Sequence, residues 1–281
     1  MYKNHIGIMQ GRLSPRYNGR YQAFPPENWK DEFPVAKSLG FDCIEFIYDY
    51  ENYETSPLTT DRGLEEIRKI SSSSSVKVFS ICADFFMRNL LFNKKEEEKR
   101  KNIALLKNLI IKSSAIGITD ITLPFVDESS LKDKNDMDNA KASIQEILPV
   151  AERCRVNINL ETDLPPDEFN LFFKDLNHPA IKINYDIGNS ASLGYNPEEE
   201  MDLYGADVSV LHVKDRLYKG GSVKLGTGNA NFEVVFRKLK EVNFKSLIIM
   251  QAARAEHYAD ERAYVEEQFV FLKTCLERWF V

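Results

Sequence analysis

The sequence of residues 208–216 is VSVLHVKDR, a short apolar run that changes to charged residues at its end. An expected helix precedes it at Pro197–Tyr204, and another follows at Asn231–Val242. Short apolar runs that alternate with amphipathic helices are typical of strands in a parallel sheet. The pattern around this stretch therefore predicts a buried strand with polar side chains at its carboxyl end.

The same alternation of short apolar runs and longer amphipathic runs extends along the whole chain. The expected strands are His5–Gln10, Cys43–Phe46, Val76–Asp84, Asp120–Phe125, Asn157–Glu161, Lys182–Asp186, Val208–Asp215 and Ser246–Gln251. The expected helices are Glu27–Leu39, Thr60–Ser72, Lys95–Ile116, Asn135–Cys154, Pro166–Leu176, Pro197–Tyr204, Asn231–Val242 and Tyr258–Leu276. Eight strands, each followed by a helix, predict an α/β fold of the (β/α)8 TIM barrel type.

The turn and helix-end residues agree with a single barrel domain over residues 1–281. The turn after the first strand contains GRLSP (residues 11–15) and lacks the G-x-G-x-x-G of a dinucleotide-binding sheet. Pro34 lies inside the first expected helix and predicts a kink or break there. The five serines at residues 71–75 are interpreted as a helix end followed by a loop.

Composition excludes several classes of protein. Of 281 residues, 43% are hydrophobic and 28% are charged, which is ordinary for a globular chain. The net charge of −6 argues against binding nucleic acid through a general basic surface. We expect no membrane span and a cytoplasmic location, because no stretch of about 18 apolar residues occurs. The four cysteines lack metal or redox spacing and are interpreted as reduced.

Polar side chains close four neighbouring expected strands, namely Glu161, Asp186, His212 and Gln251. In TIM barrels the active site lies at the carboxyl ends of the strands. A carboxylate that faces a barrel core is costly unless it is paired or coordinated. A set of oxygen and nitrogen donors without sulfur favours one divalent metal ion such as Mn, Mg, Co or Zn. Structural ion pairs, and for Gln251 a substrate contact or a satisfied core amide, are the alternatives.

Several motifs together resemble the xylose isomerase-like barrel superfamily, in particular the MQGRLSP branch of its sugar phosphate isomerases and epimerases. They are MQGRLSP (9–15), GFDCIEF (40–46), CADFFM (82–87), LPFVDESS (123–130), LETDLPP (160–166), YDIGNSASLGY (185–195), HVKDR (212–216) and LGTGNANF (225–232). The resemblance implies metal ligands at Glu161, Asp186, His212 and position 251. Gln251 departs from the family's second glutamate, and an amide cannot carry a proton. Asn189 stands where many family epimerases have a substrate-binding histidine.

Further polar residues near the strand ends are candidates for substrate binding, with packing or local ion pairs as alternatives. These candidates are Gln10, Arg12, Glu45, Asp84, Asn189, Lys214, Asp215 and Arg216. Arg216 is the strongest of the last three, because a guanidinium fork binds hydroxyl pairs and anionic oxygens. The backbone N–H groups of Gly226 and Gly228 are a candidate phosphate cradle, with a plain turn as the alternative.

The resemblance and the polar strand ends predict a metal-dependent isomerase or epimerase of a sugar or sugar phosphate. In this hypothesis Glu161 is the catalytic base that removes the proton alpha to a carbonyl, which gives an enediolate. With one carboxylate base, a 1,2 proton shift on one face is easier to draw than an epimerisation. The alternatives are a lyase or dehydratase on a related sugar acid, and a barrel that binds carbohydrate without catalysis. The expected partner is a small sugar, and a homo-oligomer is left open.

Overall fold

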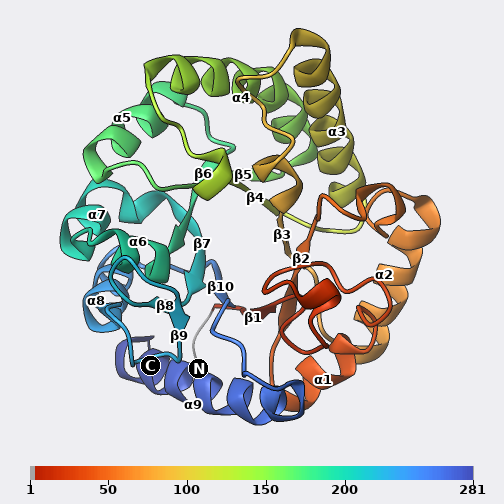
Figure 1. Ribbon diagram of the computed structural model, residues 1–281, viewed down its shortest axis with the longest axis vertical. Coiled ribbons are helices and arrows are strands. Elements are labelled where there is room, and N and C mark those ends of the chain that lie inside the picture. Colours follow the sequence, from red (N-terminus) through yellow and green to blue (C-terminus); the bar gives the residue numbers. More distant parts are fainter. Residues whose placement is uncertain (1–3, 281) are drawn as a thin grey trace. The chain divides into compact units, whose positions relative to one another are not determined.

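The computed structural model describes residues 4–280, whose eight parallel strands are arranged as a closed barrel in the order β1-β10-β7-β6-β5-β4-β3-β2 (Figure 1). The strands are β1 (Ile6–Met9), β2 (Cys43–Ile47), β3 (Ser80–Cys82), β4 (Asp120–Phe125), β5 (Asn157–Thr162), β6 (Ile181–Asp186), β7 (Val208–Val213) and β10 (Leu247–Met250). The TIM barrel predicted from the alternation is therefore confirmed.

Helices follow the strands along the chain, and most match the expected ranges within a few residues. They are α1 (Glu32–Leu39), α2 (Asp61–Ser74), α3 (Glu96–Ser114), α4 (Lys134–Cys154), α5 (Pro166–Leu176), α6 (Ile187–Leu193), α7 (Pro197–Tyr204), α8 (Phe232–Glu241) and α9 (Glu261–Phe280). The serine run ends α2, and Ser75 follows it in the left-handed conformation, with φ at 59°. Its interpretation as a helix end is confirmed.

One compact unit combines two separate segments of the described chain, residues 4–45 and residues 183–280. Its hydrophobic contacts bridge large separations in sequence, and α1 and α9 lie side by side in Figure 1. The ring of Phe41, just after α1, stacks on that of Phe269 in α9 with centroids 4.2 Å apart. On α8, Val235, Phe236 and Leu239 are buried on one face, as the amphipathic pattern requires.

The other compact unit is the continuous segment of residues 46–182. Here β4 and β5 pair in parallel over six residues, from Asp120 opposite Asn157 to Phe125 opposite Thr162. The helices α3 and α4 pack against each other and bury aliphatic faces that include Leu106 and Ile144. The unit therefore holds β5, which carries Glu161, in a continuous ladder.

The first helix differs from its prediction. The range expected over Glu27–Leu39 becomes helical only at Glu32, so Pro34 occupies the first turn of α1. Proline is tolerated there, because the N–H groups of the first turn have no partner within the helix. The kink or break predicted at Pro34 is therefore wrong, because α1 is continuous through this residue.

Two short elements near the carboxyl ends of the strands were not predicted. The helix α6 begins directly after β6, and the strands β8 (Asp215–Arg216) and β9 (Ser222–Val223) form a small antiparallel hairpin after β7. The strand expected over Val208–Asp215 therefore ends at Val213, and Asp215 belongs to the hairpin. Similarly, β3 covers only Ser80–Cys82 of the range expected to be a strand.

Strand register sets the depth of the polar side chains. Asp186 on β6 lies opposite His212 on β7, and Met250 on β10 lies opposite Val213. The residues that follow, Lys214 and Gln251, therefore leave their strands at the same level.

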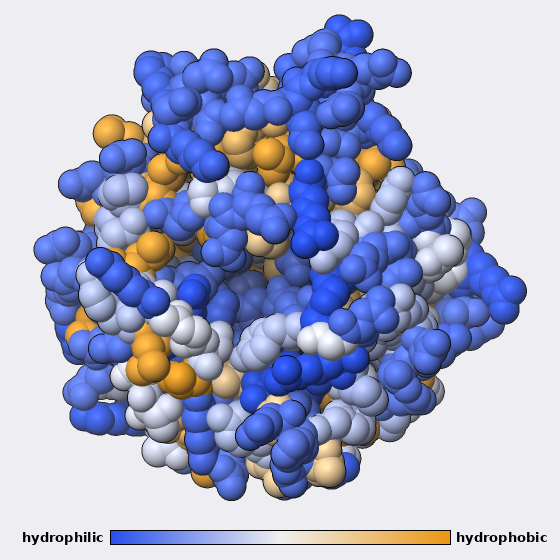
Figure 2. Space-filling model, viewed as in Figure 1, coloured by the Kyte–Doolittle hydropathy of each residue, from blue (hydrophilic) through white to orange (hydrophobic). Residues whose placement is uncertain are grey.

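The outer surface of the protein is strongly polar on the side shown in Figure 2, where hydrophilic residues dominate. In the part of the chain that the structure describes, no helix combines the length and the apolar character needed to cross a bilayer.

Candidate metal centre

Asp186 is held at the junction of β6 and α6. It is the last residue of β6 and the N-cap of α6, and its Oδ1 accepts a hydrogen bond of 2.8 Å from the backbone N–H of Asn189. Its Oδ2 accepts a hydrogen bond of 3.1 Å from Nζ of Lys214. The residue is 5% exposed, so both carboxylate oxygens are fixed in a buried environment.

A second buried carboxylate, Glu200 of α7, links α6 to the end of β6. Oε2 of Glu200 accepts hydrogen bonds from the hydroxyls of Tyr185 and Ser190, and its Oε1 accepts one of 2.9 Å from Tyr204. Burial raises the pKa of Glu200, and burial next to this carboxylate raises the pKa of Tyr185 well above its usual value. These contacts fix the residues on either side of Asp186.

His212 on β7 is fully buried and has a defined tautomer. Its Nε2 lies 2.7 Å from Oε2 of Glu45, and its Nδ1 lies 3.0 Å from the amide nitrogen of Asn184. A carboxylate only accepts, so Nε2 carries the hydrogen, and Nδ1 keeps a lone pair toward the amide donor. A histidine whose second nitrogen donates to a carboxylate is the usual arrangement of a metal-ligating histidine.

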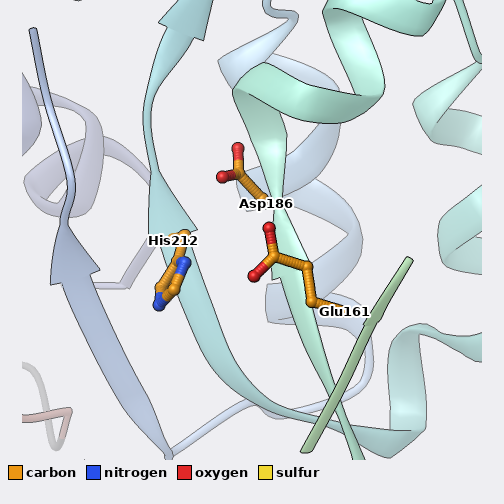
Figure 3. Close-up of side chains that lie close together, drawn as sticks. All are labelled: Glu161, Asp186 and His212. Atoms are coloured by element: carbon orange, nitrogen blue, oxygen red, sulfur yellow. The ribbon is translucent and has the colours of Figure 1, made fainter. Parts of the chain in front are cut away.

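Glu161, Asp186 and His212 come together in one cluster. Each offers one ligand atom, these atoms all lie within 4.8 Å of one another, and all three residues are buried (Figure 3). Two carboxylates and one neutral imidazole fit a divalent cation, because together they supply a charge of −2 and one nitrogen donor. The cluster unites three of the residues selected from the sequence, and it could hold one metal ion.

Gln251 has both ends of its amide occupied by protein groups. Its Nε2 donates to Oε1 of Gln22 at 2.9 Å, and its Oε1 accepts from Nζ of Lys214 at 3.3 Å. The same oxygen of Gln22 accepts from Nη2 of Arg12 at 3.1 Å. This pattern suits an amide at position 251, because a carboxylate there could not donate to Gln22.

Lys214 and Arg216 converge on Asn189. The Oδ1 atom of Asn189 accepts hydrogen bonds of 3.1 Å from Nζ of Lys214 and 2.9 Å from Nη1 of Arg216. Arg216 is further fixed by its Nε, which donates to the backbone oxygen of Gly220 in the β8–β9 hairpin. Two cations thus share one neutral oxygen beside Asp186.

Gln10 and Arg12, at the end of β1, are buried and held by the protein itself. The backbone N–H of Gln10 donates to the backbone oxygen of Glu45 at 2.9 Å. Arg12 is only 2% exposed, and its guanidinium donates to the backbone oxygens of Ala252 and Tyr21 as well as to Gln22. The structure therefore gives Arg12 a role in joining the loop after β1 to the segment after β10.

Glu45 and Asp84, two further candidates for substrate binding, also have protein partners. Glu45 on β2 is fully buried and bonds to His212. Asp84 begins a short 3-10 helix (Asp84–Met87) after β3 and accepts a hydrogen bond from the thiol of Cys82. The partner of Glu45 is thus a histidine, where the sequence analysis expected a sugar hydroxyl, lysine or arginine.

The backbone N–H groups of the loop of residues 226–230 bind a carboxylate of the protein itself. The fully buried carboxylate of Asp215 accepts hydrogen bonds of 2.8–3.0 Å from the backbone N–H groups of Gly226, Gly228 and Ala230. A Cβ atom on Gly228 would lie 2.3 Å from Oδ1 of Asp215, which explains glycine at this position. The candidate phosphate cradle is thus occupied by a side chain of the protein, and Asp215 is a structural anchor.

Three residues of this region were missed in the sequence. Gln22 lies in the long segment between β1 and α1, where no periodic pattern marks it. Asn184 shares a strand face with Asp186, as the alternation predicts, but it was not selected as a candidate site residue. Glu32, at the start of α1, accepts hydrogen bonds from the N–H groups of Gly11 and Leu13, yet it looks like an ordinary first-turn glutamate.

Comparison with known proteins agrees with this architecture. A family model described as "Xylose isomerase-like TIM barrel" matches residues 33–275. The L-ribulose-5-phosphate 3-epimerase UlaE of Shigella flexneri is 26% identical over 250 residues, which cover 84% of this chain and 86% of the relative.

Solved structures with low identity share the fold. D-psicose 3-epimerase from Clostridium cellulolyticum H10 has a TM-score of 0.78 at 15% identity, over 97% of this chain and 99% of that one. The IolI protein, solved with a bound zinc atom, also has a TM-score of 0.78, at 16% identity over 98% of this chain and 99% of that one.

Proposed function

Because the chain belongs to the xylose isomerase-like TIM barrel family, we propose that it is a metal-dependent sugar epimerase or isomerase. The observation that carries this proposal is the buried cluster of Glu161, Asp186 and His212. The name of the relative UlaE suggests a ketose 5-phosphate as the first substrate to test.

In this proposal Glu161, Asp186 and His212 hold one divalent cation. When bound, the cation polarises the carbonyl of the sugar and stabilises negative charge on its oxygen. Glu45 holds a hydrogen on Nε2 of His212, which leaves Nδ1, now facing the amide of Asn184, as the nitrogen that would bind the cation. The backbone N–H of Asn189 fixes one oxygen of Asp186.

Glu161 is the base in this proposal. It removes the proton from the carbon next to the carbonyl, and an enediolate results. Return of this proton from Glu161 to the neighbouring carbon gives an isomer, whereas a proton delivered by water to the opposite face of the same carbon gives an epimer, with Glu161 left protonated until it exchanges with solvent. Gln251 takes no proton in either route, because its amide is held between Gln22 and Lys214.

Exchange with solvent tests this proposal directly. L-ribulose 5-phosphate, L-ribulose and D-psicose are incubated in heavy water with the protein and Mn, Mg, Co or Zn. We expect deuterium next to the carbonyl in at least one sugar. Glu161→Gln keeps a liganding oxygen but loses the base, so exchange should fall by roughly 10²–10⁴-fold.

The matched control is Glu168→Gln, an exposed carboxylate on α5, which should exchange at the wild-type rate. Equal exchange by Glu161→Gln and wild type would show that another group is the base. Metal binding without exchange into any sugar would contradict catalysis and favour a carbohydrate-binding barrel.

A further inference from the structure

The ammonium group of Lys214 is enclosed by oxygen atoms near the candidate metal ligands. Its Nζ lies 3.1 Å from Oδ2 of Asp186, 3.1 Å from Oδ1 of Asn189 and 3.3 Å from Oε1 of Gln251. An ammonium has three N–H donors, so these three acceptors satisfy it completely. Its side chain is only 14% exposed.

The absence of a side chain at Gly188 leaves space for Lys214 in this position. The aliphatic part of Lys214 passes over Gly188 in α6, where an added Cβ would lie 2.7 Å from Cγ of Lys214. Any larger residue at 188 would push the lysine away from Asp186. The contact is thus built into the junction of β6, α6 and β7.

One of the oxygens bound by Lys214 belongs to Asp186, a metal ligand of the proposed function, and another belongs to Gln251, which the family resemblance implies as a fourth ligand. A divalent cation and an ammonium that share one carboxylate oxygen repel each other strongly in a buried site. We propose that Lys214 competes with the metal. Its ammonium group must leave Asp186 and Gln251 before their oxygens can hold a divalent cation. This inference rests on the metal site of the proposed function.

A Lys214 side chain that leaves Asp186 can stay within reach of Asn189. It keeps Asn189 as a partner, and the Oδ1 atom of that residue already binds Arg216 at 2.9 Å. Asp215, the nearest carboxylate in sequence, directs its oxygens to three backbone N–H groups of the 226–230 loop. The released ammonium and the guanidinium together form a site for a dianionic group such as the phosphate of a sugar phosphate.

Metal and anion therefore assist each other's binding. The metal releases the lysine that the anion needs, and the anion holds the lysine away from Asp186. By linkage, each ligand raises the affinity of the other by the same factor.

Mn(II) binding, measured from the electron paramagnetic resonance signal of the free ion, tests the competition without any turnover. Lys214→Met removes the competing ammonium and should bind Mn(II) at least tenfold more tightly than wild type. Arg216→Met is the matched control, because it removes one positive charge that contacts Asn189 and does not reach Asp186. Its affinity should change less than threefold.

Sulfate, compared with sodium chloride at equal ionic strength, tests the anion site. It should tighten Mn(II) binding severalfold in wild type, and the effect should vanish in both Lys214→Met and Arg216→Met. Loss of coupling in both variants is expected because the anion needs both cations.

The competition is overturned if Lys214→Met, shown to be folded by its thermal unfolding, binds Mn(II) no more tightly than Arg216→Met does. The anion site is overturned if sulfate leaves the wild-type affinity unchanged. If the wild-type protein exchanges sugar protons with solvent but Lys214→Met gains no affinity for Mn(II), the competition alone would be refuted. Tighter Mn(II) binding by Lys214→Met without sugar exchange in wild type would refute only the proposed function.

Discussion

At the scale of single residues, the bond between Glu45 and His212 decides which imidazole nitrogen can bind a metal. Glu45→Gln removes the negative charge that orients the ring and makes Nδ1 more basic. Loss of such a partner typically weakens metal binding by about 10–100-fold. We expect this loss for Mn(II) and Zn(II) in a competition titration against a chromophoric chelator.

The control for this prediction is Glu27→Gln, an exposed glutamate of the same unit that should leave metal affinity unchanged. Wild-type affinity in Glu45→Gln would show that the carboxylate does not govern the ligand. Thermal unfolding of both variants separates loss of the site from loss of the fold.

The sequence predicted the central cluster because strand alternation is a local property. Glu161, Asp186 and His212 each close an apolar run, and the register brings Asp186 opposite His212. The contacts of Gln251 with Gln22 and Lys214 could not be predicted in this way. Gln22 is 229 positions away in the chain, and only the folded loop shows that it faces the amide.

At the scale of elements, the start of α1 secures the loop after β1. Glu32 is 1% exposed and accepts hydrogen bonds from the N–H groups of Gly11 and Leu13 and from the hydroxyl of Ser14. Burial raises its pKa from 4.5 to about 7, although these hydrogen bonds and the charge of Arg254 act in the opposite direction. This titration makes stability depend on pH.

Between pH 4.5 and about 7, the folded chain keeps a proton on Glu32 that the unfolded chain has already lost. The contribution of Glu32 to the free energy of unfolding should therefore fall as pH rises through this range and stay constant above it. A shift of this size corresponds to about 3 kcal/mol. Glu32→Gln, which does not titrate, should lack this dependence.

Urea unfolding at intervals from pH 4.5 to 8 measures the difference between wild type and Glu32→Gln. As pH rises, the free energy of unfolding of wild type should fall relative to that of Glu32→Gln. Glu27→Gln, which changes an exposed glutamate nearby, should follow wild type throughout. A constant difference between wild type and Glu32→Gln would mean that Glu32 does not change its protonation on folding.

Among the elements, prediction succeeded where length and periodicity were sufficient. The long helices α3 and α4 were found because their apolar positions recur over several turns. The helix α6 was missed because it has only seven residues and follows β6 without a loop. Its sequence signals are Gly194 as C-cap and Asp186 as N-cap, and the analysis had assigned Asp186 only to the metal.

At the scale of the whole molecule, metal binding should stabilise the native chain, because the three ligands belong to β5, β6 and β7. A ligand that binds only the native state at 100 times its dissociation constant adds about 2.7 kcal/mol. Scanning calorimetry with and without Mn(II) should show a higher midpoint for wild type. His212→Ala should show no such rise, and an equal rise in both proteins would place the ion elsewhere.

The arrangement of the two compact units also has a consequence for folding during synthesis on the ribosome. The guanidinium of Arg12 binds the backbone oxygen of Ala252, which is translated 240 residues later. The unit that contains both residues is interrupted by the continuous segment 46–182, which is synthesised in one piece. Because β1 pairs with β10, the barrel cannot close until the last strand has been synthesised. Pairing of β1 with β10 is thus a late event in the formation of the barrel.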